Sequence, residues 1–505
     1  MKLLKVKSKG VNQLALIVPI MKKLNVAGEV DRCCGASPTN QPKASHGSII
    51  EALIANRLTS PTPMYSVSTW AEDLAIEETL GIPPELLNDD RIARTLDALD
   101  PHIQEIEAAI AVNAITEFKV GTKLVHWDIT TLLFHGEYEE SEIVKFGYSR
   151  DHRPDKKQVA TGLDVTHEGV PLMHEIYPGN TPDQKTVESN MKALQASLKE
   201  STFIVVGDRK MLEGENLRAL VKRCKFVGTL KLNNKLKDMV ASVPREDYEE
   251  LSYRGINGAK FFAAERTPKG LGVRAIIVWS EDKASRDAKN RKKKLGGMLK
   301  ALKKIKGKLN TRRYKSKSYV LEQIKKVVKG AYKKCIRWEL SGEEGELRLN
   351  YTIDREELAR VKALEGKYVL ATNVEEYSRE DVLRAYKSHH EVENAFKNLK
   401  QCIRIRPIFL HKDARIRALV FVTVLALMVY SLLQMLCRRQ GMQITTRTLF
   451  WLFRRVNLLH LFLQDGDLWL LEEPPPPLRL TLDKLGLPHP EQYISVLTPV
   501  KTSRE

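Results

Sequence analysis

The chain has 505 residues, 43% of them hydrophobic. This length predicts more than one structural unit, and the apolar fraction excludes a largely disordered protein. The net charge of +19 is concentrated between Lys283 and Lys334, where 21 lysines and arginines stand against two acids. A basic stripe on an otherwise neutral chain indicates a polyanionic partner, most simply nucleic acid, although a solubilising lysine-rich helix has the same composition.

The cysteines and the apolar runs indicate the cellular compartment of the protein. Six cysteines show neither CxxC pairing nor metal-ligand spacing with histidine, which argues against a disulfide scaffold or structural zinc. The N-terminal apolar run is interrupted by Asn12 and Gln13, so we expect no secretory signal. Residues 418–437 are long and apolar enough for a membrane span, but a helix buried on all sides in a large domain has the same pattern.

Residues 1–115 are expected to form a separate helical region, with amphipathic helices over 45–58 and 87–99. The candidate N-caps are Ser45 or Ser48 for the first helix and Asn88 or Asp89 for the second.

Alternation replaces the helical period from about residue 118 onward. The expected elements are strands at 123–134, 159–166 and 171–179, a helix at 182–198, a strand at 203–208, a helix at 217–224 and a strand at 225–232. Strands followed by helices in this order predict an α/β layer built on a mixed sheet.

That rhythm breaks between residues 233 and 365. A hairpin is expected from 259–266 and 273–280, and a strand at 346–353. The basic stretch keeps apolar residues at helical spacing, at Leu295, Met298, Leu299, Leu302, Ile305 and Leu309. It is therefore predicted to be an amphipathic helix rather than a tail, although two adjacent glycines weaken it.

The α/β rhythm returns with a strand at 367–373 and one long helix from Ser378. Ser378 and Asp381 stand in an N-cap relation close to a capping box. After Pro407 the chain is expected to be helical to about residue 464, and Pro474–Pro477 to form a stiff extended break.

Three carboxylates stand out. Asp128 lies within an apolar strand and Asp208 ends one, positions where a carboxylate is costly unless it is hydrogen-bonded or holds a cation. A turn-capping or salt-bridged aspartate is the structural alternative. Together with a helix-borne Glu393, they offer hard oxygen ligands for a pair of Mg²⁺ ions. Two such ions roughly 4 Å apart can activate a water and stabilise the leaving oxygen of a phosphodiester.

On one continuous helix, Tyr386, His389, Glu393 and Lys400 would share a face, with Lys397 beside them. Glu391 would lie about 200° round the helix and is expected to face water. A solvated amphipathic face is the alternative to a functional one.

These residues resemble the DDE transposases of bacterial insertion sequences, in the superfamily named for insertion sequence four. The hallmark is Tyr-x2-Arg-x3-Glu-x6-Lys, reproduced at Tyr386, Glu393 and Lys400 with His389 in place of arginine. Also similar are the blocks HWDITTLLF, which contains Asp128, and VVGDRKM, which contains Asp208. The resemblance extends over roughly residues 45–435.

The resemblance implies an α/β fold with a ribonuclease-H-like core, a mixed sheet flanked by helices, interrupted by a large insertion. The expected segments are a helical N-terminal region (1–115) that binds DNA ends, core parts (116–232 and 366–465), a basic insertion (233–365) and a proline-containing tail (466–505). In this reading residues 418–437 form a core helix behind the helix of the catalytic glutamate.

The resemblance also implies cleavage at the ends of a mobile element and strand transfer into target DNA. Asp128, Asp208 and Glu393 would be catalytic and would bind two Mg²⁺ ions, with Mn²⁺ as the alternative. DNA contacts are expected from Tyr386, His389, Lys397, Lys400, Arg209, Lys292, Lys293, Lys303, Lys304, Arg312 and Arg313. Trp279 would stack an unpaired base, unless it is a core tryptophan.

The implied partners are the terminal inverted repeats, the target DNA and a second copy of the chain in a synaptic homodimer, in the cytoplasm with the nucleoid and without a membrane. Two other functions fit the same residues: a ribonuclease-H-like nuclease without strand transfer, and a decayed or domesticated transposase that only binds DNA.

Two residues depart from the family pattern. His389 replaces a permanently charged bidentate phosphate donor by one that is only partly protonated at neutral pH. Lys210 stands where the family commonly has glycine, which is expected to alter the turn after Asp208.

Overall fold

The computed structural model describes residues 3–35, 44–148, 153–198, 203–255, 257–268, 270–403, 405, 408, 410–464 and 466–497. The chain divides into two compact units. The first comprises Met1–Met211 and Ser388–Glu505, and the second comprises Leu212–Lys387.

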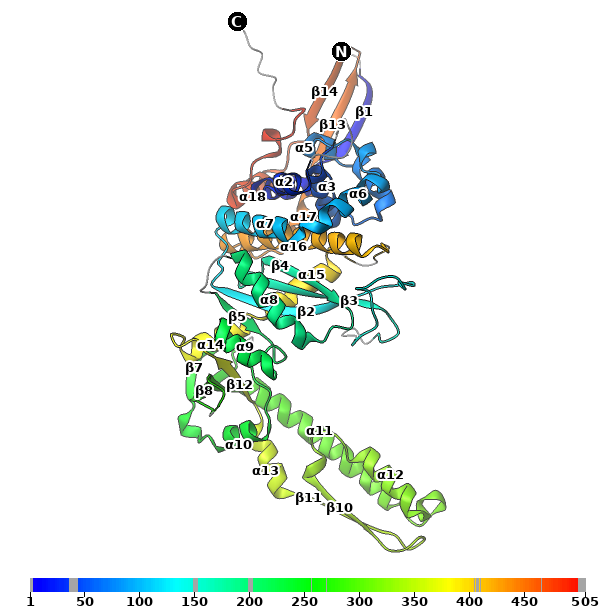
Figure 1. Ribbon diagram of the computed structural model, residues 1–505, viewed down its shortest axis with the longest axis vertical. Coiled ribbons are helices and arrows are strands. Elements are labelled where there is room, and N and C mark those ends of the chain that lie inside the picture. Colours follow the sequence, from blue (N-terminus) through cyan, green and yellow to red (C-terminus); the bar gives the residue numbers. More distant parts are fainter. Residues whose placement is uncertain are drawn as a thin grey trace. The chain divides into compact units, whose positions relative to one another are not determined.

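The central element of the first unit is α16 (Asp413–Arg439), which is buried without interruption from Ala418 to Leu433. Helices α3 (His46–Thr59) and α6 (Asp89–Leu99) pack on it, and so does strand β4 (Figure 1). In the described part of the chain it is the one helix long and apolar enough to cross a membrane, and 89% of its apolar window is buried. The prediction of a core helix at 418–437 is confirmed.

Arginines hold both ends of α16. At its start, Arg415 and Arg417 form bidentate pairs with Asp97 and Asp100, at distances of 2.6–2.8 Å. At its end, Arg439 pairs with Glu168 at 2.7 Å. Planar guanidinium–carboxylate pairs fix orientation as well as distance, so they set how α16 lies against its neighbours.

The N-terminal region contains five further α-helices among the described residues, four of which pack on α3. They are α1 (Leu14–Lys23), α2 (Val26–Cys34), α4 (Val67–Glu72), α5 (Ile76–Leu80) and α7 (Ile103–Phe118). Ser45 caps α3 and Asn88 caps α6, each accepting a hydrogen bond from a backbone N–H three residues later. Both predicted helices are confirmed, and the open choice of cap is decided in each case.

The N-terminal region is not wholly helical. Strand β1 (Leu3–Gly10) pairs antiparallel with β13 (Asn457–Leu463), which pairs with β14 (Gly466–Leu471). The expected helix up to residue 464 is therefore wrong: α17 (Thr446–Phe453) ends earlier and β13 follows.

The proline run does not remain extended either. Helix α18 (Pro476–Leu485) begins inside it. Prolines are tolerated in the first turn of a helix because the N–H groups that they lack have no intrahelical partner there. The prediction of a stiff break over Pro474–Pro477 therefore fails at its second half.

The first unit also contains a mixed sheet in the order β4-β3-β2-β5. Its strands are β2 (Leu124–Leu133), β3 (Gln158–Thr166), β4 (Pro171–Pro178) and β5 (Ile204–Gly207), and α8 (Asp183–Leu198) joins the last two. Strand β3 is antiparallel to both neighbours, whereas β5 is parallel to β2. The strands predicted from alternation are confirmed, and the fold is mixed α/β.

The second unit contains strands in the order β6-β12-β9-β8-β7, each antiparallel to its neighbour. They are β6 (Lys225–Thr229), β7 (Glu249–Arg254), β8 (Lys260–Arg266), β9 (Arg274–Ser280) and β12 (Lys367–Thr372), accompanied by α9 (Glu215–Arg223), α10 (Asn234–Ser242), α13 (Arg355–Leu364) and α14 (Arg379–Lys387). The division thus places β6 and β12 in this unit, although we expected them in the core. The assignment of segments to core and insertion stays a prediction.

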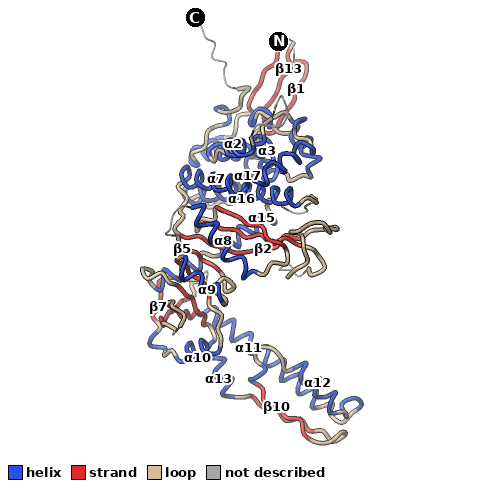
Figure 2. Tube along the Cα trace, viewed as in Figure 1, coloured by secondary structure: helices blue, strands red, loops and turns tan. Residues whose placement is uncertain are grey.

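The basic segment forms a distinct part of the second unit, which we call the basic arm (Glu281–Ile353). Helices α11 (Glu281–Lys306) and α12 (Lys317–Val327) lie along the hairpin β10 (Ile336–Ser341) and β11 (Arg348–Ile353) (Figure 2). A cluster of buried apolar side chains joins them, including Leu295, Leu302, Ile305, Val320, Ile324 and Leu349. The predicted amphipathic helix is confirmed, and α11 continues through the two glycines.

The burial of α16 predicts a large effect of core truncation. Leu427 is fully buried in α16, whereas Leu480 on α18 is 60% exposed. Leu427→Ala removes buried methyl groups and leaves a cavity, so it should lower the free energy of unfolding by about 2–5 kcal/mol. The same substitution at Leu480 should change it by less than about 0.5 kcal/mol. Urea titration of both variants checks this, and equal losses would contradict the central role of α16.

A second prediction concerns Glu51 on α3, which lies where α3 and α2 approach closely. A Cβ on Gly47 would stand 2.3 Å from the carbonyl oxygen of Ala27, so only glycine fits there. Glu51 is 6% exposed. Burial raises the pKa of Glu51 to about 7, against the opposing charge of Lys22.

The folded chain therefore holds the Glu51 proton up to about pH 7, while the unfolded chain releases it near pH 4.5. The ionisation of Glu51 therefore does not affect the free energy of unfolding below pH 4.5. As the pH rises from 4.5 to 7, the free energy of unfolding falls by up to about 3 kcal/mol, because only the unfolded chain can release the proton. Glu51→Gln should remove that loss, so its stability relative to wild type should increase between pH 4.5 and 8 in urea titrations. A difference independent of pH would contradict this assignment.

Candidate active site

The parallel pairing of β2 with β5 brings two aspartates together. The register joins Leu124 to Ile204 and His126 to Val206. Continued by two residues along both strands, this register places Asp128 beside Asp208, the residue that directly follows β5. In-register neighbours of a sheet point to the same face and lie about 4.8 Å apart. Asp128 and Asp208 therefore form an adjacent pair on one face of the sheet, beside the C-terminal end of β5.

Local backbone groups orient both carboxylates. The Oδ1 of Asp128 accepts the N–H of Ile129 at 2.7 Å. The Oδ1 of Asp208 accepts the N–H groups of Lys210 and Met211 at 2.8 and 3.3 Å. The two hydrogen bonds to Asp208 form a side-chain-capped turn. One oxygen of Asp208 thus stabilises the backbone, and the other can bind another ligand. Both side chains are half-buried.

The turn after Asp208 has ordinary backbone geometry. Lys210 is absent from the described non-glycine residues with positive φ, so no glycine is needed there. The Lys210 Nζ lies 5.7 Å from the centre of the Tyr148 ring. The Asp208 cap forms with the lysine in place, and the expectation that lysine alters the turn relative to the family's glycine stays a prediction.

The helix of the signature is divided. Helix α14 ends at Lys387 and α15 (His390–Gln401) begins three residues later. The expectation of one continuous helix is therefore wrong, and Tyr386 does not share a single helical face with the residues that follow. Tyr386 belongs to the second unit, where its ring lies 6.1 Å from that of Tyr368.

The two glutamates of α15 differ in environment. Glu391 has a side chain only 15% exposed and pairs with Arg438 of α16 at 3.1 Å. Glu393 is exposed, and no hydrogen bond or ion pair of its carboxylate is found among the described residues. The expectation that Glu391 faces water is therefore wrong. The glutamate with a structural partner is Glu391, and Glu393 carries the uncommitted carboxylate.

Helix α15 packs on β2, β3 and α16. Its start meets the face of β2 that carries the aspartate, because Ser388 Oγ lies 3.2 Å from Nε2 of His126, two residues before Asp128. Residues two apart on a strand point to the same face. Glu393 follows His389 by about one helical turn and lies on the same side of α15. The three carboxylates thus come from elements that border one face of the sheet.

His126 is a site residue that we did not single out from the sequence. Its ring centre lies 5.8 Å from that of His389. The alternation of β2 already placed His126 on the Asp128 side, but a buried histidine has no sequence signal of its own.

Both histidines are neutral at physiological pH. Burial lowers the pKa of His126 to about 3, assisted by the positive charge of neighbouring histidines. Burial also lowers the pKa of His389 to about 4, and the nearby Asp208 carboxylate only partly opposes this. His389 therefore does not supply the cation that arginine would supply at this position.

The remaining residues predicted to contact DNA fall into two groups. Near the carboxylates, Arg209 and Lys397 are exposed and Lys400 is half-buried. On the basic arm, the side chains of Lys292, Lys293, Lys303, Lys304, Arg312 and Arg313 are all exposed and form no ion pair among the described residues. Their charges are therefore available to a polyanion.

Trp279 lines a cavity of about 330 Å³ in the second unit, together with Arg245, Tyr248, Phe262 and Lys367. Its ring is half-buried and tilted against that of Phe262, with 5.4 Å between centres. Aromatic walls with two cations at the rim could receive a base and its phosphate.

The donor set near Asp128 and Asp208 fits Mg²⁺. Among the described residues, no group of three histidine, cysteine, aspartate or glutamate side chains is close enough to form a complete metal cage. Magnesium does not need such a cage, since proteins commonly hold it by one or two carboxylates while water and substrate phosphates complete its octahedron. The adjacent Asp128 and Asp208 supply this minimum.

Two family models match the chain. One, described as "Domain of unknown function (DUF4277)", matches residues 6–112. The other, described as "Transposase DDE domain", matches residues 128–429. No curated protein matches the chain. The second match covers more than half of the sequence and spans all three carboxylates, and the chain therefore belongs to the DDE transposase family.

Proposed function

We propose that this transposase cuts DNA at the ends of a mobile element of the insertion-sequence-four superfamily and joins the freed ends to target DNA. The observation that carries the proposal is the in-register pair Asp128 and Asp208, beside a helix that presents the uncommitted Glu393. The order of β2 to β5, three antiparallel strands and a fourth parallel to the first, supports a ribonuclease-H-like core.

In this proposal Asp128, Asp208 and Glu393 hold two Mg²⁺ ions, or Mn²⁺, between the protein and the scissile phosphate. When bound, such ions lower the pKa of a water and neutralise charge on the leaving oxygen. The backbone N–H groups of Lys210 and Met211 hold the Asp208 carboxylate in a fixed orientation before the DNA arrives. This preorganisation reduces the cost of assembling the phosphate, the water and the carboxylates.

Phosphate contacts beside the cleaved strand would come from Arg209, Lys397 and Lys400 of the first unit. Tyr386, in the second unit, stays a predicted DNA contact. His389, being neutral, would donate one uncharged hydrogen bond, so its contribution is smaller than that of the family's arginine. Trp279 would stack a base in its aromatic cavity. In the cytoplasm, two copies would hold two element ends as a synaptic dimer.

The neutral His389 also favours a second candidate function. With one fixed phosphate cation missing, the chain could retain DNA binding through the basic arm while cleavage is slow or absent. A nuclease that cleaves without strand transfer is distinguished by the product: transposition joins a labelled element end to a plasmid, whereas a nuclease releases only cut ends.

The two glutamates give a direct test of the catalytic assignment. Glu393→Gln keeps size and removes one negative charge, so Mg²⁺-dependent cleavage of a labelled element end should fall by at least about 100-fold, as expected on losing a carboxylate that acts in the transition state. Glu391→Gln should keep most of the activity, because its carboxylate is engaged by Arg438. An inactive Glu391 variant beside an active Glu393 variant would overturn the assignment.

The basic arm gives a second test. Lys303→Gln with Lys304→Gln should reduce the slope of log affinity for DNA against log salt by up to about two, since each phosphate contact contributes about 0.9. The matched control is Glu322→Gln with Lys326→Gln, which removes an ion pair of 2.6 Å on the same arm without changing its net charge. Filter binding at several salt concentrations measures both slopes, and equal slopes would rule out a phosphate contact at Lys303 and Lys304.

A further inference from the structure

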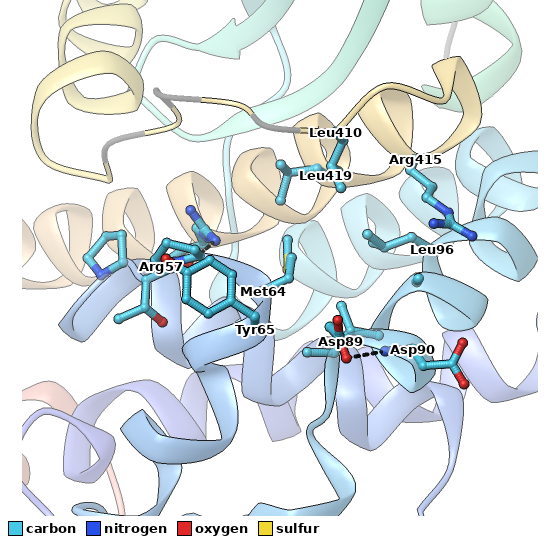
Figure 3. Close-up of a pocket in the computed structure, with 14 residues that line it drawn as sticks. Arg57, Met64, Tyr65, Asp89, Asp90, Leu96, Leu410, Arg415 and Leu419 are labelled. Carbon is cyan, nitrogen blue, oxygen red and sulfur yellow. Dashed lines mark hydrogen bonds between the residues drawn. The ribbon is translucent and has the colours of Figure 1, made fainter.

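A groove in the first unit is separate from the residues assigned above. It has a volume of about 670 Å³ and lies between α3, the turn η1 (Met64–Ser66), α6 and the start of α16. We call it the α3–α6 groove. Figure 3 shows Arg57, Met64 and Tyr65 toward one end, and Asp90, Leu96 and Arg415 toward the other. Its volume lies within the range of small-molecule sites.

Arg57 is the unusual residue of this groove. It is only 6% exposed, and no carboxylate forms an ion pair with it among the described residues. Its Nη2 donates to the carbonyl oxygen of Thr62 at 3.0 Å, while its Nε–H is buried without a hydrogen-bond partner. Burial lowers the pKa of Arg57 to about 10, which still leaves it charged at neutral pH. A buried charge without a counter-ion is costly and is usually paired when the protein functions.

The side chains that line the α3–α6 groove determine which kind of anion can bind there. Much of the lining is apolar, including Pro61, Met64, Ile92, Leu96, Leu410 and Leu419. Tyr65 is 75% exposed and offers an aromatic surface to a ligand. An anion that binds here must therefore carry an apolar body, because a bare ion would leave these walls in contact with water.

The other charges of the groove disfavour DNA. Arg415 is already paired with Asp97 in a bidentate contact. Asp89 and Asp90 line the groove as well, and Asp90 pairs with Arg94, which does not line the groove. Among the described lining residues Arg57 is thus the one cation without a carboxylate partner. Of the described charges without an opposite partner, the groove offers one cation, Arg57, and one carboxylate, Asp89, so a polyanion would find one cation for its several charges, whereas a ligand with a single negative group needs only one.

We infer that the α3–α6 groove binds a small organic monocarboxylate with an apolar body, whose carboxylate pairs with Arg57. Guanidinium and carboxylate match in charge and in hydrogen-bonding geometry, so the ligand would supply the counter-ion that Arg57 lacks. The ligand would join α3 and α6 to α16 and so stabilise the N-terminal part of the first unit. The site is independent of the carboxylates Asp128, Asp208 and Glu393.

The probe is 4-phenylbutyrate, compared with the neutral 4-phenylbutan-1-ol, by titration calorimetry on the full chain. The acid should bind once per chain and the alcohol at least about tenfold more weakly, since a charge-assisted hydrogen bond is lost. In the Arg57→Gln variant, the affinity for the acid should fall to the affinity for the alcohol. No binding of the acid, or equal binding of both compounds, overturns the inference.

A matched control separates ligand binding from loop support. Asn56 holds the same loop through Ser60 and Thr62, at 3.0–3.3 Å, but does not line the groove. Asn56→Ala should therefore keep the affinity for the acid. Equal losses in both variants would mean that Arg57 acts only as a tether of the loop, which overturns the inference.

Two further measurements cover the case in which Arg57→Gln does not fold. Ala93 lines the groove and is half-buried, so the larger side chain in Ala93→Trp should fill the space. The affinity for 4-phenylbutyrate should then fall at least about tenfold, although Arg57 is still present. Binding of the acid unchanged by Ala93→Trp would overturn the proposed location. Displacement of the acid by a tetrathymidylate would show that the groove binds nucleic acid instead.

Discussion

The first unit depends on one constraint: an α-helix that is apolar on every side must be covered on every side. Leaving 16 consecutive buried residues of α16 in water would expose their apolar surface at a cost of about 25 cal/mol per Å². The cover comes from distant segments, with α3 and α6 from the N-terminal region and β4 and α15 from the region of the carboxylates. One helix therefore joins the residues matched by the domain of unknown function to those of the transposase domain.

The same helix also determines which glutamate is free. Packing of α15 on α16, β2 and β3 orients the helix with Glu391 beside Arg438, so Glu393, about 200° round the helix, is turned to the other side. The interruption between α14 and α15 makes α15 a separate helix, and this helix packs on α16. The position of the acidic side chain over the sheet is thus a consequence of core packing rather than of the signature residues alone.

Local pattern was sufficient for much of this organisation. Alternation around Asp128 and the short apolar run before Asp208 predicted β2 and β5, and the apolar spacing of α11 outweighed its paired glycines. Three features had no local signal. The pairing of β1 with β13 joins residues more than 400 positions apart, so a strand with exposed lysines could be recognised only through its partner. The interruption at Ser388 and His389 has no proline or glycine to mark it. The environment of Glu391 depends on Arg438, whose approach is set by the tertiary fold.

The pairing of β1 with β13 and the burial of α16 also have a consequence for biosynthesis. Helix α3 is complete at Thr59, but the helix that covers its apolar face ends at Arg439, some 380 residues later. At about 5–20 residues per second, a ribosome takes roughly 20 to 80 s to produce that segment. During this interval α3 and α6 lack the part of their native packing that α16 supplies, so the growing chain exposes apolar surface and is prone to aggregation before the second half of the transposase domain has emerged.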